Sequence, residues 1–550
     1  MGNAEIAQTL DAYGSLLDLA GAGRYTVRAY RRAAELIRDT RAPVAELVRA
    51  GRARDLRGIG PGIERRLVEL VETGRIADLE DLEREVQPQL VALGRLVGLG
   101  PQRMVALGRE LGIRTADELG AAARAGRLRE VKGIGPATER KILAGLARER
   151  PQRRGLLLNR ARALAEALAR ELDAEVAGDV RRWCDVIFDL TLVSSAPEAI
   201  DRLESSRTVV AIVEREQDRA VGVTVEGVPV TLVLTSAELH GTTLVRATGS
   251  AEYVKSLGEL PEANTEEALY ARLGLPWCPP ELREAAIGSD LPTLVELEAI
   301  RGDLHCHTTW SDGKASVEEM AVAARRLGYE YVAICDHTPN VRVVPGLDAD
   351  ALRRQAEEIA EVNERLAPFR VLCGTECDIR ADGTLDLPDE ALAELDWVQL
   401  SLHAGQRDEA DRLTSKVVEA MRHPAVRCLS HPKGRIINHR PPNALQLERV
   451  LEVAVEEGVA LETNGLPDRL DLRDTDVRLA VDAGVRIVCS TDAHSVRGLD
   501  NMRLAVATAR RGWATGPDVL NTRGLDEILG RVPPAAQPAR HTRIPPTSSA

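Results

Sequence analysis

The chain has 550 residues, enough for three or four domains that each bury a core. Its hydrophobic fraction of 44% and charged fraction of 29% are typical of a soluble globular protein. No segment approaches the roughly 18 consecutive apolar residues of a membrane span, and the first residues lack the pattern of a signal peptide. Eight cysteines without a C-x-x-C pair exclude a disulfide scaffold and a zinc ribbon. We therefore expect a cytoplasmic protein with no membrane partner.

Charge and histidine are unevenly distributed. The net charge is −13, but residues 1–150 carry +5 and the rest of the chain carries −18. A mildly basic N-terminal region is compatible with nucleic-acid binding, whereas an aromatic content of 3% argues against base stacking as the main binding mode. Eight of the ten histidines lie between His305 and His494, which indicates metal or phosphate chemistry in that region.

Residues 1–150 have the apolar spacing of helices and contain one short pattern three times, at 56–61, 96–101 and 131–136. Each copy is a Gly-hydrophobic-Gly-Pro turn that precedes an amphipathic helix. Such a turn exposes backbone N–H groups beside the positive end of a helix, where a phosphate oxygen can bind whatever the base sequence. The alternative is that these glycines only cap helices. We favour binding to the DNA backbone through Gly58, Gly60, Gly98, Gly100, Gly133 and Gly135.

The rest of the chain changes character twice. Residues 170–250 are rich in Val, Leu and Thr, with short alternating stretches typical of a mixed sheet. Residues 275–300 form a proline-containing connector. From residue 301 onward, strands alternate with helices, and each strand ends in a polar or histidine-bearing tip. That order predicts a distorted parallel β/α barrel with a site at the carboxyl ends of its strands.

Nine potential metal ligands follow these predicted strands. His305 and His307 are two residues apart at one strand end, and the others come at or just past later strand ends. Six histidines and three carboxylates can hold three divalent cations at three or four ligands each. His423 and His439 fall outside the pattern, and we expect them on the surface or in loops. The predicted ligands are His305, His307, Asp312, His337, Glu376, His403, His431, Asp492 and His494.

These motifs carry a resemblance to two families. HxHTxxSDG, the DH after a strand, GxExDIxxDG, SxH, HPxGR and TDAH together resemble the PHP (polymerase and histidinol phosphatase) phosphoesterases. The junction GLPWCPPELRE, which leads into LVELEAIRGDLHCHTTWSDG, resembles that of bacterial family X DNA polymerases. The resemblance implies a helical 8-kDa-like domain at 1–80, a helical fingers-like domain at 81–150 and a family X palm and thumb at 151–290. It further implies a PHP domain at 300–530. The five prolines of residues 531–550 predict a disordered tail.

The resemblance also implies the grouping of the ligands. It assigns His305, His307, Glu376 and Asp492 to one cation as catalytic residues, Asp312, His337 and His494 to a second, and Glu376, His403 and His431 to a third. Bridged cations deprotonate a water near neutral pH, and imidazole-rich ligation favours Zn²⁺ or Mn²⁺ over Mg²⁺. Arg435 and Lys433 of HPKGR are candidates to hold a phosphate oxygen, although a solvated loop is an equal alternative.

The polymerase motifs depart from the family X pattern. Asp189 matches the first aspartate of the family's Asp-x-Asp strand, but Thr191 and Thr231 stand where the other two carboxylates belong. A neutral hydroxyl does not replace a carboxylate in holding Mg²⁺ against a triphosphate, so we expect Asp189 to be vestigial and the polymerase site inactive. Arg66 stands where some relatives have a Schiff-base lysine, and a guanidinium does not form that adduct.

The leading hypothesis is therefore a metal-dependent phosphoesterase acting on DNA, as a 3′→5′ exonuclease or a 3′-end-processing repair nuclease. One alternative is a small-molecule phosphatase of the histidinol-phosphate type. Others are a DNA-binding scaffold with structural metals and a residual gap-filling polymerase. The domains are complete enough to allow a monomer.

Overall fold

The computed structural model describes residues 1–19, 22–39, 43–56, 58–79, parts of 107–142, and 155–530 apart from 225, 287, 289, 342 and 343. Two compact units divide the chain. The first comprises residues 1–156, 164–177 and 188–243, and the second comprises residues 157–163, 178–187 and 244–550. None of the described helices is both long and apolar enough to cross a membrane. The predicted 531–550 tail and most of the predicted 81–150 domain lie outside the described residues.

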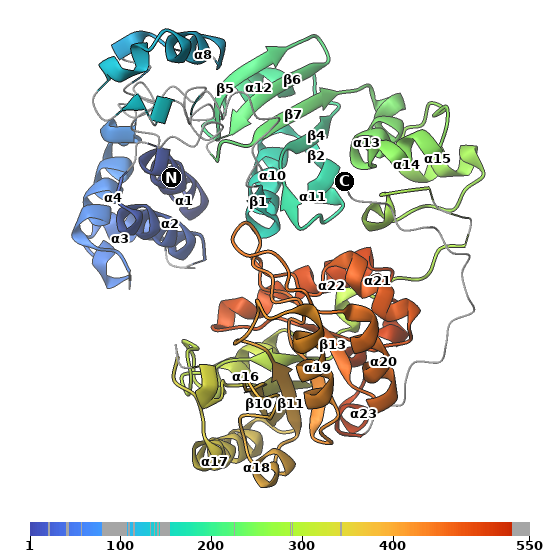
Figure 1. Ribbon diagram of the computed structural model, residues 1–550. Coiled ribbons are helices and arrows are strands. Elements are labelled where there is room, and N and C mark those ends of the chain that lie inside the picture. The colour runs from blue at the N-terminus through green and yellow to red at the C-terminus, as the bar shows by residue number, and fades with distance from the viewer. Residues whose placement is uncertain are drawn as a thin grey trace. The chain divides into compact units, whose positions relative to one another are not determined.

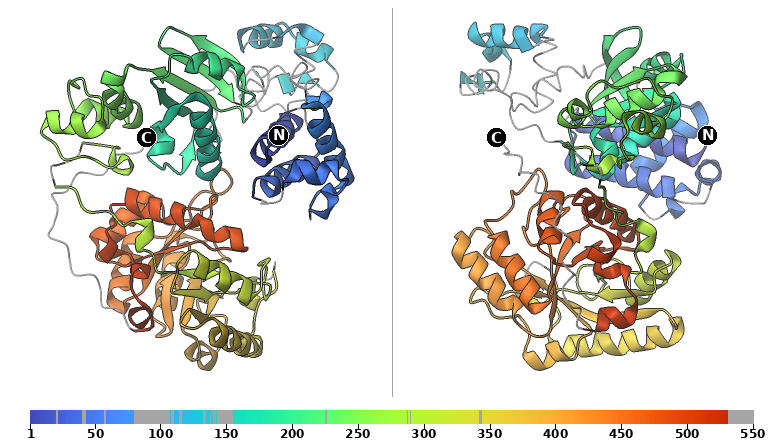
Figure 2. Two further views of the ribbon diagram at one scale, coloured as in Figure 1. Left: turned by 180° about the vertical axis from the view of Figure 1, so that it is seen from behind. Right: turned by 90° about the vertical axis from the view of Figure 1, so that its right-hand side faces the viewer.

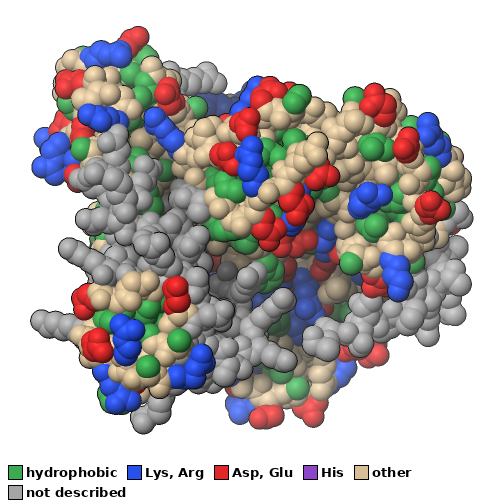
Figure 3. All heavy atoms as spheres, turned by 90° about the horizontal axis from the view of Figure 1, so that it is seen from above, with side chains coloured by type: hydrophobic (Ala, Val, Ile, Leu, Met, Phe, Trp, Pro, Cys, Tyr) green, Lys and Arg blue, Asp and Glu red, His purple; other side chains and the backbone are tan. Residues whose placement is uncertain are grey.

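Helices form the N-terminal region, as predicted (Figure 1). The apolar faces of the first four helices meet in one core that includes Ile6, Leu10, Leu67 and Leu70, all fully buried, and the helix at 116–124 packs in a separate core. On the face of the molecule in Figure 3, Lys and Arg side chains lie interspersed with Asp and Glu. The helices are α1 (Asn3–Leu19), α2 (Arg24–Asp39), α3 (Val44–Arg49), α4 (Pro61–Thr73) and, farther along, α8 (Ala116–Arg124).

The first Gly-x-Gly turn and the flanking residues of the third lie in described residues, and their backbone hydrogen bonds match. In the first turn the Ile59 N–H donates to the Leu56 carbonyl at 3.1 Å and the Gly60 carbonyl accepts from the Glu64 N–H at 2.9 Å. In the third copy the Val131 carbonyl accepts from the Ile134 N–H at 3.1 Å, and the Gly135 carbonyl accepts from the Glu139 N–H at 3.0 Å. The described residues of the two copies thus share these two hydrogen bonds, and the turn of the first copy caps α4. Gly98, Gly100 and Gly133 lie outside the described residues.

A five-stranded mixed sheet, in the order β2-β4-β7-β6-β5, follows. Its strands are β2 (Ala174–Ala177), β4 (Leu190–Ser194), β5 (Val209–Arg215), β6 (Arg219–Thr224) and β7 (Pro229–Leu234). Strands β4 and β7 pair in parallel and the other pairs are antiparallel. The same stretch of the chain also contains β1 (Leu156–Leu157), α10 (Leu158–Leu172), α11 (Gly178–Arg181), β3 (Val186–Ile187) and α12 (Ala199–Ser205). The Val-rich stretches of the sequence are thus strands, as predicted.

The segment from 240 to 286 packs around a buried carboxylate. It contains α13 (His240–Thr248), α14 (Ala251–Ser256) and α15 (Glu266–Leu273). Two arginines bind Glu266, with 2.6 Å from Arg181 Nη1 and 2.6 Å from Arg283 Nη1 to Glu266 Oε1. Arg283 is fully buried, so this ion pair is part of the core of the second unit.

The C-terminal region is a nearly closed parallel barrel, as predicted (Figures 1 and 2). Its sheet order is β14-β13-β12-β11-β10-β9-β8, and a parallel bridge between Cys306 and Ala493 links its first and last strands. The strands are β8 (Gly302–Cys306), β9 (Tyr331–Ile334), β10 (Arg370–Asp378), β11 (Trp397–Ser401), β12 (Val426–Leu429), β13 (Ala460–Asn464) and β14 (Ile487–Ser490). Nearly all their residues are buried, which explains the continuous apolar runs in the sequence.

Amphipathic helices cover the outside of the barrel. Their apolar faces pack on the strands, and their ends carry capping signals; the Ser316 side chain, for example, forms a capping box with Glu319. This frame places all the strand-end loops on one rim. The helices are α16 (Val317–Arg326), α17 (Ala349–Leu366), α18 (Asp389–Ala393), α19 (Ala410–Met421), α20 (Leu447–Glu457), α21 (Asp474–Asp482), α22 (Met502–Arg511) and α23 (Leu525–Leu529).

Candidate metal centre

The barrel brings all nine predicted ligands together. Each lies in the last residues of a strand or just after it, and in a parallel barrel those ends share one rim. Three groups have ligand atoms within 4.8 Å of one another. All groups of this kind found among the described residues belong to this rim. They comprise His305, His307 and Asp492; His307, Asp312, His337 and His494; and His337, Glu376 and His403.

The first group lies deepest, between strands β8 and β14. His307 Nε2 lies 3.2 Å from His305 Nε2 and 3.1 Å from Asp492 Oδ1. Glu376 Oε2 is 3.6 Å from Nε2 of each histidine. All four side chains are buried. Four donor atoms that converge in a buried position are arranged to surround a cation.

The second group is closer to solvent and centres on Asp312. The two oxygens of Asp312 lie 3.6 Å from His337 Nε2 and 3.2 Å from His494 Nε2. The ring of His307 stacks on that of His494 with centroids 4.3 Å apart, so this histidine borders both groups. Asp312 and His494 are about a quarter to a third exposed, which leaves room for a substrate to approach.

Glu376 links the remaining histidines to the first group. Its Oε2 lies 2.8 Å from His337 Nδ1, and its Oε1 lies 2.8 Å from His431 Nε2 and 3.7 Å from His403 Nε2. The two carboxylate oxygens therefore face different sets of imidazoles. This is the geometry that a bridging carboxylate needs.

The electrostatics favour ionised carboxylates at the rim. Burial opposes ionisation of Asp312, but the hydrogen bond with His494 and the nearby imidazoles outweigh it and lower its pKa to about 2. The same contacts overcome burial at His494 and raise its pKa to about 9. Burial, His337 and His494 together lower the pKa of His307 to about 4. Imidazoles likewise hold the pKa values of Glu376 and Asp492 well below the usual range, against burial.

Two residues of the centre have positive backbone φ. Asp492 has φ 50° and His431 has φ 25°. This conformation is uncommon for residues other than glycine, and it is retained where surrounding contacts impose it, often at functional sites. Here it turns both side chains back toward the barrel axis, directly after β14 and β12.

The residues present fit divalent cations. Among the described residues, the buried Nδ1 atom of His307 has no hydrogen-bond partner and lies 3.9 Å from Asp312 Oδ1, as expected of a nitrogen arranged to coordinate a metal. The donor set of imidazoles and carboxylates suits Zn²⁺ and Mn²⁺. PHP domains are metal-dependent, and the clusters supply the ligand types that this dependence requires.

Sequence reasoning missed the carboxylates behind the ligands. Glu462 is fully buried, accepts from His305 Nδ1 at 2.7 Å and accepts from the His431 backbone N–H at 2.7 Å. Asp378 similarly accepts from the His403 backbone N–H at 2.9 Å. The sequence contains a signal for Glu462, because β13 also ends in polar residues and is the one later strand that supplies none of the nine predicted ligands.

Comparisons with known proteins agree with this geometry. A helix-hairpin-helix domain model matches residues 1–76, and a PHP domain model matches residues 303–464. The DNA polymerase/3′-5′ exonuclease PolX of Bacillus subtilis is 34% identical over 96% of this chain and 99% of its own length. The chain belongs to the PHP-containing family X DNA polymerases.

Other relatives match a smaller share of this family X chain. A probable phosphatase of Acetivibrio thermocellus is 31% identical over 35% of this chain and 78% of its own length. A probable phosphatase of a Thermoanaerobacter species (strain X514) is 28% identical over 40% of this chain and 89% of its own length. The PHP domain of the chain is that of a metal-dependent phosphoesterase.

The mixed sheet of this family X chain holds the two threonines side by side. Thr191 of β4 and Thr231 of β7 are register partners in the parallel pair, and both are half-buried. Asp189 lies just before β4 and is exposed. Asp179 is paired with Arg182 at 2.5 Å. The positions that the sequence aligned with the family's carboxylates are therefore neighbours, occupied by one carboxylate and two hydroxyls.

The proposed phosphate clamp Arg435 is placed differently from the sequence expectation. Its Nε donates to the Arg469 carbonyl at 2.8 Å and its Nη2 donates to the Leu470 carbonyl at 2.5 Å. The side chain is 9% exposed. Lys433 Nζ donates to the Leu445 carbonyl at 2.8 Å. Arg435 Nη1 is also paired with Asp185 Oδ2 at 2.6 Å. These contacts favour a structural role for the two cations over contact with a substrate.

Proposed function

We propose that this protein is a metal-dependent 3′→5′ exonuclease or 3′-end-processing phosphoesterase that acts on DNA. The observation that carries the proposal is the convergence of nine imidazole and carboxylate side chains on one barrel rim, with Glu376 between His337 and His431 at 2.8 Å from each. The relative named DNA polymerase/3′-5′ exonuclease supports DNA as the substrate. The Gly-x-Gly turns at Gly60 and Gly135 support binding to its backbone.

The chain's residues divide the work of hydrolysis. His305, His307, Glu376 and Asp492 would hold one cation, Asp312, His337 and His494 a second, and His403 and His431 with Glu376 a third. When bound, Zn²⁺ or Mn²⁺ supplies Lewis-acid activation of a water and neutralises charge on the phosphate. The buried set fixes the geometry, and the exposed edge at Asp312 and His494 admits the scissile phosphate.

The polymerase core is proposed to be inactive. Catalysis by family X polymerases needs carboxylates to hold two metals against a triphosphate, and the paired Thr191 and Thr231 offer only neutral hydroxyls. Asp189 alone cannot hold both ions. The sheet would then serve as a DNA-binding part of a nuclease.

The test uses purified protein with a 5′-labelled, 3′-recessed duplex and Mn²⁺, with and without deoxynucleotides. We expect the labelled strand to shorten from its 3′ end, no extension, and no shortening by the H305A/H307A double variant. Unchanged DNA in all lanes contradicts the nuclease proposal. Extension that the double variant retains and that D189A abolishes contradicts the inactive polymerase core.

A second candidate is a small-molecule phosphatase. It is favoured by the relatives named probable phosphatases, which match 35% and 40% of this chain. Hydrolysis of small phosphomonoesters by the wild type, sensitive to H305A/H307A and without any cleavage of DNA, would establish this alternative.

A further inference from the structure

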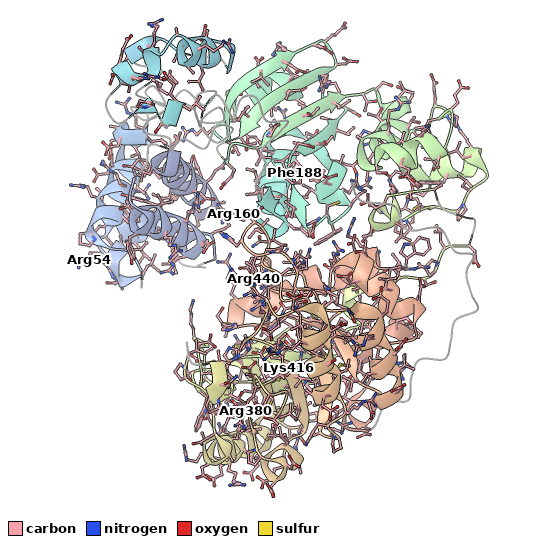
Figure 4. The ribbon with its side chains drawn as sticks, viewed as in Figure 1. Arg54, Arg160, Phe188, Arg380, Lys416 and Arg440 are labelled. Atoms are coloured by element: carbon pink, nitrogen blue, oxygen red, sulfur yellow. The ribbon has the colours of Figure 1, made fainter. Side chains whose placement is uncertain are left out.

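Three successive loops at the carboxyl end of the barrel each carry an arginine. Arg407 follows β11, Arg440 lies between β12 and α20, and Arg469 follows β13. Figure 4 labels Arg440 on its loop. Because the strands are parallel, these loops border the same rim as the metal ligands. None of the three arginines was assigned a role from the sequence.

Arg469 is the arginine that reaches the metal centre. Its Nε lies 3.8 Å from Asp492 Oδ2, on the side of that carboxylate opposite the histidines that face Oδ1. Its side chain is 18% exposed. Beyond this ion pair its guanidinium makes no hydrogen bond to any residue that the structure describes. Most of its donors thus remain available beside the position of a bound phosphate.

The backbone around Arg469 is held rigidly. Arg435 binds the carbonyls of Arg469 and Leu470, and the Asp468 carbonyl accepts from the Ile437 N–H at 2.7 Å. Asp471 is fully buried and accepts from the backbone N–H groups of the Arg435 loop. Such support lowers the entropy lost when a side chain binds its ligand. Arg435 therefore positions Arg469 by holding its backbone.

Arg440 and Arg407 extend the positive charge away from the centre. Arg440 Nε donates to the Gly434 carbonyl at 2.7 Å, and Arg407 is exposed. Burial and the charges of Arg469 and Arg407 lower the pKa of Arg440, against the opposing effect of the Asp471 carboxylate. By contrast, the other barrel cations labelled in Figure 4 are paired, Lys416 with Asp408 at 3.5 Å and Arg380 with Asp386 at 3.0 Å.

We propose that Arg469, Arg440 and Arg407 form a subsite for the sugar-phosphate backbone of a single DNA strand. Arg469 binds the phosphate at the metal centre, and Arg440 and Arg407 bind the next phosphate along the strand. The guanidinium fork matches phosphate oxygens, and unneutralised cations gain most from such a ligand. This inference rests on the proposed function and deepens it, because it makes the preferred substrate a chain of phosphodiesters rather than a small phosphoester.

The test compares two substrates with the full-length protein loaded with Mn²⁺. One is a five-residue thymidine oligonucleotide, and the other is thymidine 5′-(p-nitrophenyl phosphate), which has a single phosphodiester. We expect R407Q and R440Q to lower the ratio of kcat/KM for the oligonucleotide to that for the single diester about tenfold each. R469Q should lower kcat/KM for both substrates. The matched control is R473Q. Arg473 lies in the same loop as Arg469, is about half exposed and is paired with Asp476.

Binding and metal content complete the test. In metal-depleted protein, R407Q should weaken oligonucleotide binding and reduce its logarithmic salt dependence by about 0.7, the value for one lost contact to a single strand. The metal content of R469Q after reloading should match that of the wild type. An unchanged substrate ratio for R407Q and R440Q, or loss of metal by R469Q, overturns the subsite. A wild-type protein that hydrolyses neither substrate overturns the proposed function instead.

Discussion

Glu462 Oε1 accepts a hydrogen bond from His305 Nδ1 at 2.7 Å, inside a barrel where both side chains are fully buried. The bond leaves Nε2 of His305 directed at His307 and Asp492. Glu462 also accepts from the His431 N–H at 2.7 Å and, through Asn464, is linked to Asp492. One carboxylate thus orients groups from three strand ends.

Replacing Glu462 should weaken metal binding. We expect E462Q to lose about 10- to 100-fold in metal affinity, because a neutral amide no longer fixes the tautomer of His305 or raises its basicity. Equilibrium dialysis followed by elemental analysis measures the affinity. The control is E452Q, because Glu452 is exposed on α20. If E462Q binds metal as tightly as the wild type but hydrolyses more slowly, Glu462 does not act through the metal ligands.

The barrel and its ligands were predictable because two strong signals coincide there. Strands buried on both faces give continuous apolar runs, and a polar residue that ends such a run lies at the common rim. The partners of these ligands were not predictable in the same way. Glu462 is 157 residues from His305, and the donors of Arg435 are bound by carbonyls 34 and 35 residues away. Such contacts depend on loop conformation, including the positive φ of Leu470, which no periodicity encodes.

Removal of metal should destabilise the protein. Chelation leaves the ring nitrogens of His305 and His307 facing each other at 3.2 Å, with no cation between the carboxylates and imidazoles. A cation present at 100 times its dissociation constant stabilises the folded state by about 2.7 kcal/mol for each site. We therefore expect treatment with a chelator to lower the Tm, and Mn²⁺ or Zn²⁺ to restore it. The H305A/H307A variant should show a smaller shift; an equal shift would place the stabilising metal elsewhere.

The first Gly-x-Gly turn offers a test of DNA-backbone binding that leaves folding intact. Gly60 caps α4 with ordinary extended backbone, and a side chain added there meets nothing within 4 Å. Aspartate is a preferred N-cap, so G60D should fold at least as well as the wild type. Its carboxylate would nevertheless occupy and repel the phosphate position, and we expect affinity for duplex DNA to fall about tenfold.

A charge-matched control for G60D is T26D. Thr26 is exposed in the first turn of α2, so the variant adds the same charge at a helix N-terminus of the same core without a Gly-x-Gly turn. Fluorescence anisotropy with a labelled duplex measures both affinities. Equal weakening by the two variants would mean that net charge, rather than the turn, governs binding.

The buried Glu266 should make stability depend on pH in the acid range. Burial opposes its ionisation, but hydrogen bonds from Arg283 and Arg181 dominate and lower its pKa from the ordinary 4.5 of a glutamate to about 2. A depressed pKa in the folded state gives stability that is fully present above about pH 4.5 and is lost as the pH falls through about 2. The difference between the two pKa values corresponds to about 3 kcal/mol in the free energy of unfolding. Hence E266Q, which also leaves the buried Arg283 unpaired, should lower the Tm clearly at pH 7, and the difference in Tm from the wild type should narrow below pH 4.

The control for E266Q is E267Q, because Glu267 is its exposed neighbour on α15, and we expect no such difference in Tm for this variant. A difference between E266Q and wild type that stays constant from pH 7 to pH 2.5 would show that packing, and not the charge of Glu266, stabilises this segment.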